Sequence, residues 1–510
     1  MQEKILVLDF GGQYNLLIAR RIRQQHVYAE VKSYNSITTA QIQKEGYQGI
    51  VFTGGPNSVY DASSPHFDPG ILGLGIPILG ICYGHQLLAW MAGGEIKAAG
   101  NAGEYGRVTL RTAGCVLFEE VPSESVCWMS HTDFVSAVPV GFRITASTEN
   151  CPCAAMADDE RRLYGVQFHP EVDHTAFGRE MLRNFLYSVC RAHGDWTMAD
   201  FKRRSVEALR ASIGRGRVLL ALSGGVDSSV LAALLSEAVG RQLKCVFVDH
   251  GLLRKNEGDE VEAAFSGRAL DFLRVDAGAD FLGRLRGVQD PEEKRHIIGE
   301  AFIRVFEAQA KKIGAVDFLA QGTIYPDVIE SGLGQSAVIK SHHNVGGLPD
   351  YVDFKEILEP LRLLFKDEVR QLGRELGLPE SLVSRQPFPG PGLAIRVIGE
   401  VTEEKLALLR EADAIFREEI AKAGLDQSAS QYFAVLTNLR SVGVMGDGRS
   451  YDYAVALRSV QTSDFMTADW SRLPYELLDR VSVRIVNEVK GVNRVLYDIT
   501  SKPPATVEYE

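Results

Sequence analysis

Short runs of apolar residues alternate with amphipathic stretches through the first part of the chain. The runs KILVLDF, GIVFTGGP and IPILGIC end at glycine turns, and helical patterns such as YNLLIARRIRQQ and HQLLAWMAGG lie between them. Strands without polar alternation are typical of a sheet buried on both faces, because helices cover both sides. The pattern predicts an open, mainly parallel α/β domain over residues 1–192.

A second alternation of the same kind begins at His193. Its apolar runs are RVLLALS, KCVFVDH and DFLAQGT, separated by helical stretches such as SSVLAALLSEAVG. The proline- and glycine-rich segment RQPFPGPGLAIR marks the next boundary. We therefore expect a second open α/β domain over residues 193–385 and a smaller α+β domain over residues 386–510.

Composition narrows the class of protein. The 55 basic and 66 acidic residues give a formal net charge of −11, which gives no sign of a nucleic-acid partner. Seven dispersed cysteines favour reduced thiols and a cytoplasmic location. The stretch ILGLGIPILGIC is too short to span a membrane, and the first apolar run is interpreted as a buried strand, not a secretory signal.

The stretch GICYG, Gly80 to Gly84, places Cys82 between a buried strand and a helical pattern. This is the arrangement of a nucleophile elbow with cysteine in place of serine, where small neighbours permit the sharp turn. The helix N-terminus would favour the nucleophilic thiolate. Taken alone, the pattern is equally compatible with a structural cysteine between two packing glycines.

Two further stretches favour the catalytic interpretation. In YGVQFHPEV, His169 and Glu171 are two residues apart after an apolar run, so in extended chain they point the same way. A thiol, an imidazole and a carboxylate can serve as nucleophile, base and orienting group. Two backbone N–H groups are suited to an oxyanion hole. One belongs to Gly55 in the loop FTGGPNS, and the other belongs to Tyr83, the residue after the nucleophile.

In this order and spacing, TGGP, GICYGHQ and GVQFHPE resemble the class I glutamine amidotransferase domain. The resemblance implies that Cys82 attacks the side-chain amide of glutamine and forms a γ-glutamyl thioester. It further implies that His169 protonates the departing ammonia and then activates water, while Glu171 holds His169. Such a cycle yields only glutamate and ammonia, so an acceptor for the ammonia is expected elsewhere in the chain.

The second domain carries a glycine turn without the lysine of a Walker loop. The stretch SGGVDSS joins an apolar run to a helical pattern, and its backbone N–H groups can cradle an anion. Asp227 fits beside phosphates if Mg²⁺ lies between them. The residues expected to form this cradle are Ser223, Gly224, Gly225, Val226, Asp227, Ser228 and Ser229.

This loop resembles the pyrophosphatase loop of the N-type ATP pyrophosphatases. The resemblance implies that the loop grips the pyrophosphate released when a substrate oxygen attacks the α-phosphorus of ATP. It places adenosine near Val248, at the end of CVFVDH. The later stretch VIKSHHNVGGLP offers Lys340, His342 and His343 as polyphosphate contacts on a lid, although a plain surface loop explains them equally well.

The third region contains FPGPGLAIRV, RSVGVMGDGRSYDYAVALR and SKPPATVEYE, which closely match the glutamine-hydrolysing GMP synthetase family. The resemblance implies that xanthosine 5′-monophosphate (XMP) is adenylated by ATP and that ammonia then displaces AMP to leave GMP. It also implies a homodimer formed through the third domain. The nucleotide contacts carried over are Arg295, Asp447, Lys502 and Glu508.

Two other classes compete with this interpretation. Glutamine-dependent NAD synthetase shares the adenylating loop, but its glutaminase is of a nitrilase-like type, so the elbow at Cys82 argues against it. A non-catalytic nucleotide sensor would retain the fold, but Cys82, His169, Glu171 and Asp227 are all present.

Overall fold

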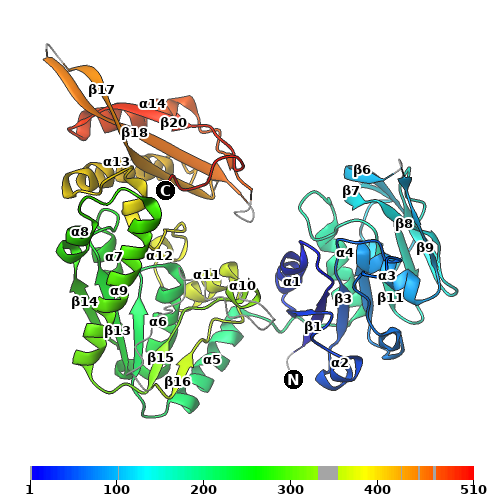
Figure 1. Ribbon diagram of the computed structural model, residues 1–510. Helices are drawn as coiled ribbons and strands as arrows, with labels where there is room; N and C mark the ends of the chain where they lie inside the picture. The colour runs from blue at the N-terminus through cyan, green and yellow to red at the C-terminus, as the bar shows by residue number, and fades with distance from the viewer. Residues whose placement is uncertain (1–2, 101–102, 331–353, 427, 446–447, 463–466) are drawn as a thin grey trace. The chain divides into compact units, whose positions relative to one another are not determined.

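The structure is a computed structural model that describes residues 3–100, 103–330, 354–426, 428–445, 448–462 and 467–510 (Figure 1). Within these residues the chain forms two compact units, one ending at Phe201 and one beginning at Lys202. Helix α5 (Met198–Ile213) includes this boundary. No helix in the described ranges combines the length and the apolar character needed to cross a membrane.

The first unit is built on a mixed sheet. In spatial order the strands are β2 (Tyr28–Ser33), β1 (Lys4–Asp9), β3 (Gly49–Phe52), β4 (Ile78–Ile81), β11 (Leu163–Val166), β10 (Ala155–Asp158), β9 (Arg143–Ser147), β6 (Glu104–Thr112) and β7 (Glu124–His131). Neighbouring strands are parallel from β2 to β11 and antiparallel from β11 to β7. The parallel half is the expected α/β core, and the antiparallel half extends it.

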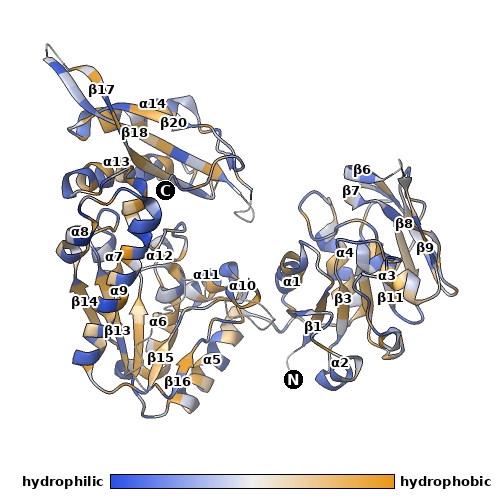
Figure 2. Ribbon diagram, viewed as in Figure 1, coloured by the Kyte–Doolittle hydropathy of each residue, from blue (hydrophilic) through white to orange (hydrophobic). Residues whose placement is uncertain are grey.

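Helices and a small second sheet complete the first unit. They are α1 (Asn15–Arg23), α2 (Thr39–Glu45), α3 (Tyr83–Met91), α4 (Gly178–Asn184), the short helices η1 (Pro69–Gly73), η3 (Val116–Phe118) and η4 (Phe185–Val189), and the strand pair β5 (Glu95–Ala98) and β8 (Asp133–Ala137). Strands β3 and β4 are apolar and buried along their length, and β1 is apolar and buried between its charged end residues Lys4 and Asp9. Figure 2 colours the residues of the structure by hydropathy. The glycine turns that follow them therefore lie at one edge of the sheet.

The second unit begins with a parallel sheet. Its strands, in spatial order, are β14 (Asp271–Asp276), β13 (Leu243–Asp249), β12 (Val218–Leu222), β15 (Phe318–Ala320) and β16 (Glu356–Leu358). After β12 the chain runs outward through β13 and β14, and later returns to the other side of β12 at β15. The strand order thus reverses beside the end of β12, which is where open parallel sheets bind ligands.

The helices associated with this sheet are α6 (Val226–Val239), η5 (Gly240–Gln242), α7 (Glu257–Phe265), α8 (Gly278–Leu285), α9 (Pro291–Ile313), α10 (Tyr325–Glu330), α11 (Lys366–Glu375), α12 (Glu380–Val383) and η6 (Gly392–Arg396). The long helix α9 begins with Pro291 at its first position and is capped by the Asp290 side chain. Both features are common at helix N-termini, because they suit backbone N–H groups that lack a partner within the helix.

The last part of the chain is an α+β layer. It contains α13 (Glu403–Lys422), β17 (Gln431–Met445), β18 (Gly448–Gln461), β19 (Asp469–Trp470), α14 (Tyr475–Glu488) and β20 (Val492–Asp498). Strand β18 pairs antiparallel with β17 and parallel with β20, and the two helices pack on this sheet (Figure 1).

One apolar core joins this layer to the parallel sheet of the second unit. It includes Val246 and Phe281 from the parallel-sheet part and Phe416 and Leu457 from the last part. The described residues from Lys202 onward therefore form one compact unit. The division of this unit into two domains near residue 385 stays a prediction.

Candidate functional site

Cys82 occupies a sharp turn between β4 and α3. Its φ of +55° lies in the left-handed region, which costs a residue other than glycine about 1–3 kcal/mol. The two flanking glycines lie against backbone: a Cβ on Gly80 would lie 2.6 Å from the carbonyl carbon of Gly84, and one on Gly84 would lie 2.6 Å from the Cβ of Phe52. Only glycine permits this close packing of strand and helix.

His169 and Glu171 lie just beyond β11 in the same unit. His169 Nδ1 is 2.7 Å from Glu171 Oε1, and their side chains are 7% and 0% exposed. Burial by itself lowers the pKa of His169, but the charge of Glu171 and the hydrogen bond with Cys82 outweigh it and hold that pKa well above its usual value. The imidazole is therefore held as a cation beside the thiol.

A cavity of about 270 Å³ opens next to Cys82. The predicted oxyanion residues Gly55 and Tyr83 both line it. Among the described residues, neither of their backbone N–H groups meets a hydrogen-bond acceptor. The cavity thus offers a nucleophile and two unused donors around one space, and the His169 imidazole hydrogen-bonds to that nucleophile. This is the arrangement required for acyl transfer.

The cavity is also lined by residues that the sequence analysis did not single out. They include Gln86, Tyr105 and residues 130–133, which run from the end of β7 to the start of β8. The Ser130 carbonyl oxygen is 3.6 Å from Cys82 Sγ. The polar run SHTD at residues 130–133 is the one sequence feature that could have indicated these lining residues. Nothing in that run itself predicts a contact with Cys82.

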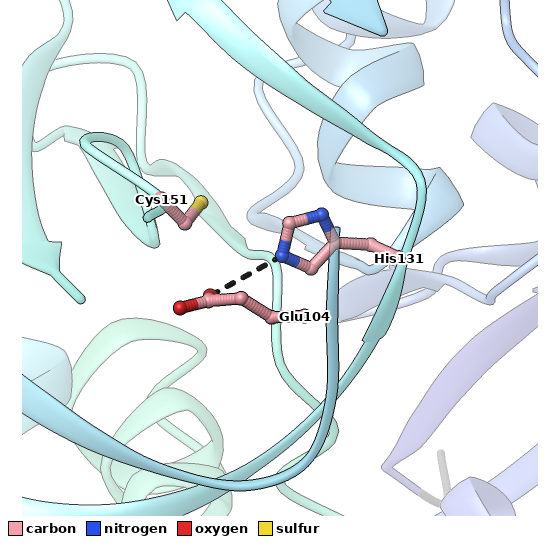
Figure 3. Close-up of side chains that lie close together, drawn as sticks. All are labelled: Glu104, His131 and Cys151. Carbon is pink, nitrogen blue, oxygen red and sulfur yellow. Dashed lines mark hydrogen bonds and ion pairs between the residues drawn. The ribbon is translucent and has the colours of Figure 1, made fainter. Parts of the chain in front are cut away.

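One of these lining residues, His131, also belongs to a buried cluster with Glu104 and Cys151 (Figure 3), whose polar atoms lie within 4.8 Å of one another. It has the residue types of a metal site. However, Thr148 Oγ1 already donates to both oxygens of Glu104 at 2.8 Å. Burial also raises the pKa of the Cys151 thiol far above its usual value, while a metal ligand must be a thiolate. We interpret the cluster as a hydrogen-bonded pair beside a neutral thiol.

His85, next to the elbow, is buried and lies outside the cavity wall. Burial lowers the pKa of His85 to about 3, so its ring is neutral. A Cβ on Gly165 of β11 would overlap this ring, so the imidazole packs on the strand. His85 thus acts as a core residue.

The loop Ser223–Gly225 joins β12 to α6 in the second unit. Gly224 has φ of +77°, and the Ser223 and Ser228 hydroxyls are 3.0 Å apart. Val226 begins α6, and no side chain caps this helix. The Ser229 hydroxyl and Asp227 Oδ1 are buried without a hydrogen-bond partner among the described residues. The loop therefore presents unused donors and one unused carboxylate oxygen at a helix N-terminus.

A lysine from another element lies beside this loop. Lys366, the first residue of α11, places Nζ 2.5 Å from Asp227 Oδ2. The two residues are 139 positions apart. No local pattern could have indicated this contact, because it depends on how α11 packs beside α6.

The predicted nucleotide contacts lie partly in the described residues. Arg295 Nη2 donates to the Glu510 carbonyl oxygen at 2.6 Å, and Arg396 binds Glu508 with two nitrogens at 3.0 and 2.8 Å. The Lys502 backbone pairs with Ala468. Val248 is buried near the end of β13. Four other predicted residues, Lys340, His342, His343 and Asp447, lie outside the described residues.

The fold and the elbow site define a class I glutamine amidotransferase joined to an adenylating α/β unit. Residues 6–189 match the family model for "Glutamine amidotransferase class-I", residues 203–277 match "Asparagine synthase" and residues 418–509 match "GMP synthase C terminal domain".

Curated relatives extend the match to the whole chain. It is 62% identical to "GMP synthase [glutamine-hydrolyzing]" of Ruminiclostridium cellulolyticum, and the alignment covers 100% of this chain and 99% of the relative. The protein of the same name from Acetivibrio thermocellus is 62% identical with the same coverage, and that from Finegoldia magna is 61% identical over 99% of each chain. The chain belongs to the glutamine-hydrolyzing GMP synthase family.

Proposed function

We propose that this chain converts XMP to GMP, with glutamine as nitrogen donor and ATP cleaved to AMP and pyrophosphate. Family membership supports the overall reaction, since the relatives named above are glutamine-hydrolyzing GMP synthases. The observation that carries the glutaminase part is the His169–Glu171 pair of 2.7 Å beside the cavity of Cys82.

In the first unit, Cys82 is the nucleophile. Its thiolate attacks the side-chain carbonyl carbon of glutamine, while the N–H groups of Gly55 and Tyr83 stabilise the charge that develops on oxygen. His169 gives its proton to the leaving nitrogen, which departs as ammonia, and a thioester remains. Neutral His169 then takes a proton from water, which hydrolyses the thioester and restores the thiolate. Glu171 keeps the imidazole oriented and charged.

In the second unit, the loop from Ser223 to Ser229 holds the β- and γ-phosphates of ATP through backbone N–H groups and hydroxyls. Lys366 adds the positive charge that the loop itself lacks. The unpartnered Asp227 Oδ1 suits Mg²⁺, which prefers carboxylate and phosphate oxygens and would offset the charge of the departing pyrophosphate. Val248 would lie against the adenosine.

Arg295, Asp447, Lys502 and Glu508 are proposed to bind XMP, with Lys340, His342 and His343 as lid contacts to polyphosphate. Arg295 is well suited to an anionic group, because guanidinium binds phosphate with two parallel hydrogen bonds. Ammonia would then attack the carbon of the base that carries the adenylated oxygen. That oxygen would leave as part of AMP.

A homodimer and a cytoplasmic location complete the proposal. Leu439, Val442, Val444 and Tyr451, on β17 and β18, are 52–77% exposed, and such apolar patches mark protein interfaces. The seven cysteines carry no disulfide, which suits a reducing compartment. Sedimentation of the purified chain at the mass of a monomer would contradict the dimer.

Product analysis tests the reaction. Incubation with XMP, ATP, Mg²⁺ and glutamine is expected to yield GMP, AMP, pyrophosphate and glutamate in equal amounts, measured by chromatography. Omission of XMP should stop AMP release. Formation of ADP and orthophosphate in place of AMP and pyrophosphate would refute the proposed cleavage.

A further inference from the structure

A chain of hydrogen bonds connects the buried wall of the cavity to the nucleophile. The carbonyl oxygen of Asp133 sets the direction of this chain, because a carbonyl oxygen can only accept hydrogen bonds. That oxygen receives His131 Nδ1 at 3.0 Å and Gln86 Nε2 at 2.8 Å. Both groups must therefore donate, so His131 carries a proton on Nδ1 and the Gln86 amide is oriented with its nitrogen towards Asp133.

The orientation of Gln86 in turn fixes that of Gln167. Gln86 Nε2 lies 3.1 Å from Gln167 Oε1, so its second hydrogen is donated there. The Gln167 side chain is fully buried, and its remaining amide nitrogen lies 3.8 Å from Cys82 Sγ. The amide nitrogen of Gln167 therefore donates towards the sulfur atom, and the amide oxygen of Gln167 accepts from Gln86.

The other end of the chain is held by Glu104 (Figure 3). His131 Nε2 lies 3.4 Å from Glu104 Oε2. Glu104 also accepts from Thr148 Oγ1 at 2.8 Å and from the Asn150 N–H at 3.4 Å. Donors surround this carboxylate, so it remains an acceptor, and the His131 ring must carry a second proton on Nε2 to hydrogen-bond with it. This contact keeps the ring in the orientation from which Nδ1 reaches Asp133.

We propose that Gln167 is a catalytic residue of the glutamine site, whose amide N–H donates a hydrogen bond to the Cys82 thiolate. Gln86 acts as a positioning residue for Gln167, and Glu104 and His131 hold the carbonyl that orients Gln86. This inference rests on the proposed glutaminase function of Cys82.

The chemistry of the cycle explains why such a donor is useful. A hydrogen bond to an anionic sulfur is stronger than one to a neutral thiol or thioester. Gln167 therefore favours the thiolate before attack, as does the His169 imidazole, whereas the Ser130 carbonyl oxygen 3.6 Å from the sulfur favours the thiol. Gln167 favours the same thiolate when water cleaves the thioester and sulfur departs with the electron pair of the carbon–sulfur bond. The donor acts on the charged sulfur without itself exchanging a proton.

The experiment compares Gln167→Leu with Gln48→Leu in the full-length chain. Leucine removes the donor at similar size. Gln48 is a matched control, because it is half-buried in the same unit, hydrogen-bonds to Glu3 and lies outside the cavity wall. The measurements are the pH dependence of Cys82 alkylation by iodoacetamide, followed by mass spectrometry of its peptide, and the kcat and KM for glutamine.

Gln167→Leu is expected to slow alkylation at neutral pH about tenfold and to shift its midpoint to higher pH. The kcat for glutamine should fall by a similar factor with little change in KM, while synthesis from free ammonium stays normal. Gln86→Leu, which frees the Gln167 amide to rotate, should shift the midpoint in the same direction by a smaller amount. Gln48→Leu should change none of these quantities.

An alkylation midpoint in Gln167→Leu that matches Gln48→Leu would overturn the inference, as would a change confined to KM. If Gln167→Leu does not fold, an unshifted midpoint in Gln86→Leu would overturn it. A wild-type chain that makes GMP from ammonium but not from glutamine would instead refute the proposed glutaminase function, whatever the variants show.

Discussion

The imidazole of His169 is subject to two opposing effects. Burial disfavours its charged form, whereas Glu171 at 2.7 Å and the Cys82 side chain favour it, and the second effect is the larger. The charge of Glu171 is the largest of the contributions that keep the residue beside the nucleophile a cation.

Glu171→Gln tests this balance. The amide keeps the shape but removes the negative charge, so burial dominates and the pKa of His169 should fall below the usual value of about 6.5. The imidazolium form would then be lost at lower pH than in the wild type, and kcat/KM for glutamine should drop by roughly 100-fold or more. Histidine NMR titration measures the pKa; a value still well above 6.5 in the variant would show that Glu171 is not its cause.

At the scale of elements, the cavity forms because α3 approaches β3 and β4 very closely. The approach needs glycine at residues 80 and 84, which the local sequence GICYG displays directly. Both glycine-turn loops, at Cys82 and at Ser223, were predictable for the same reason: each is a short segment whose strand, turn and helix follow one another. Lys366, Gln86 and Gln167 received no predicted role, because their contacts join elements distant in sequence.

Gly84→Ala should therefore damage the first unit. Its Cβ would meet the backbone and Cβ of Phe52, so α3 must move, at a cost of about 1–3 kcal/mol in the free energy of unfolding. Glutamine-dependent synthesis should fall as the elbow shifts. Gly73→Ala is the matched control, since a Cβ there meets nothing within 4 Å. Thermal unfolding of both variants measures the difference, and equal melting temperatures would contradict the packing argument.

At the scale of the whole molecule, each candidate site lies inside one compact unit: Cys82, His169 and Glu171 in the first, Asp227 and Lys366 in the second. The sequence predicted two α/β folds and a following α+β layer, which the structure and the family matches confirm. The antiparallel half of the first sheet was less evident, because its strands β6 and β7 carry mixed burial patterns without long apolar runs.

The separation of sites predicts separable defects. Cys82→Ala should abolish synthesis from glutamine and leave synthesis from ammonium unchanged, because the thiol serves only ammonia release. Asp227→Asn should reduce synthesis from both nitrogen sources by roughly 100-fold, since it removes the carboxylate charge that would hold Mg²⁺ against the phosphates. Steady-state assays with each nitrogen source provide the comparison. Equal loss with both sources in Cys82→Ala would contradict independent sites.

The contact between Lys366 and Asp227 also bears on protein engineering. A Walker loop brings its own cation and can in principle be transplanted as one short segment. Here the anion cradle and its positive charge are contributed by segments 139 residues apart. A graft of the SGGVDSS turn into another α/β scaffold would carry the acidic group without its counter-charge, so the recipient should repel nucleotides unless a lysine is installed on a neighbouring helix.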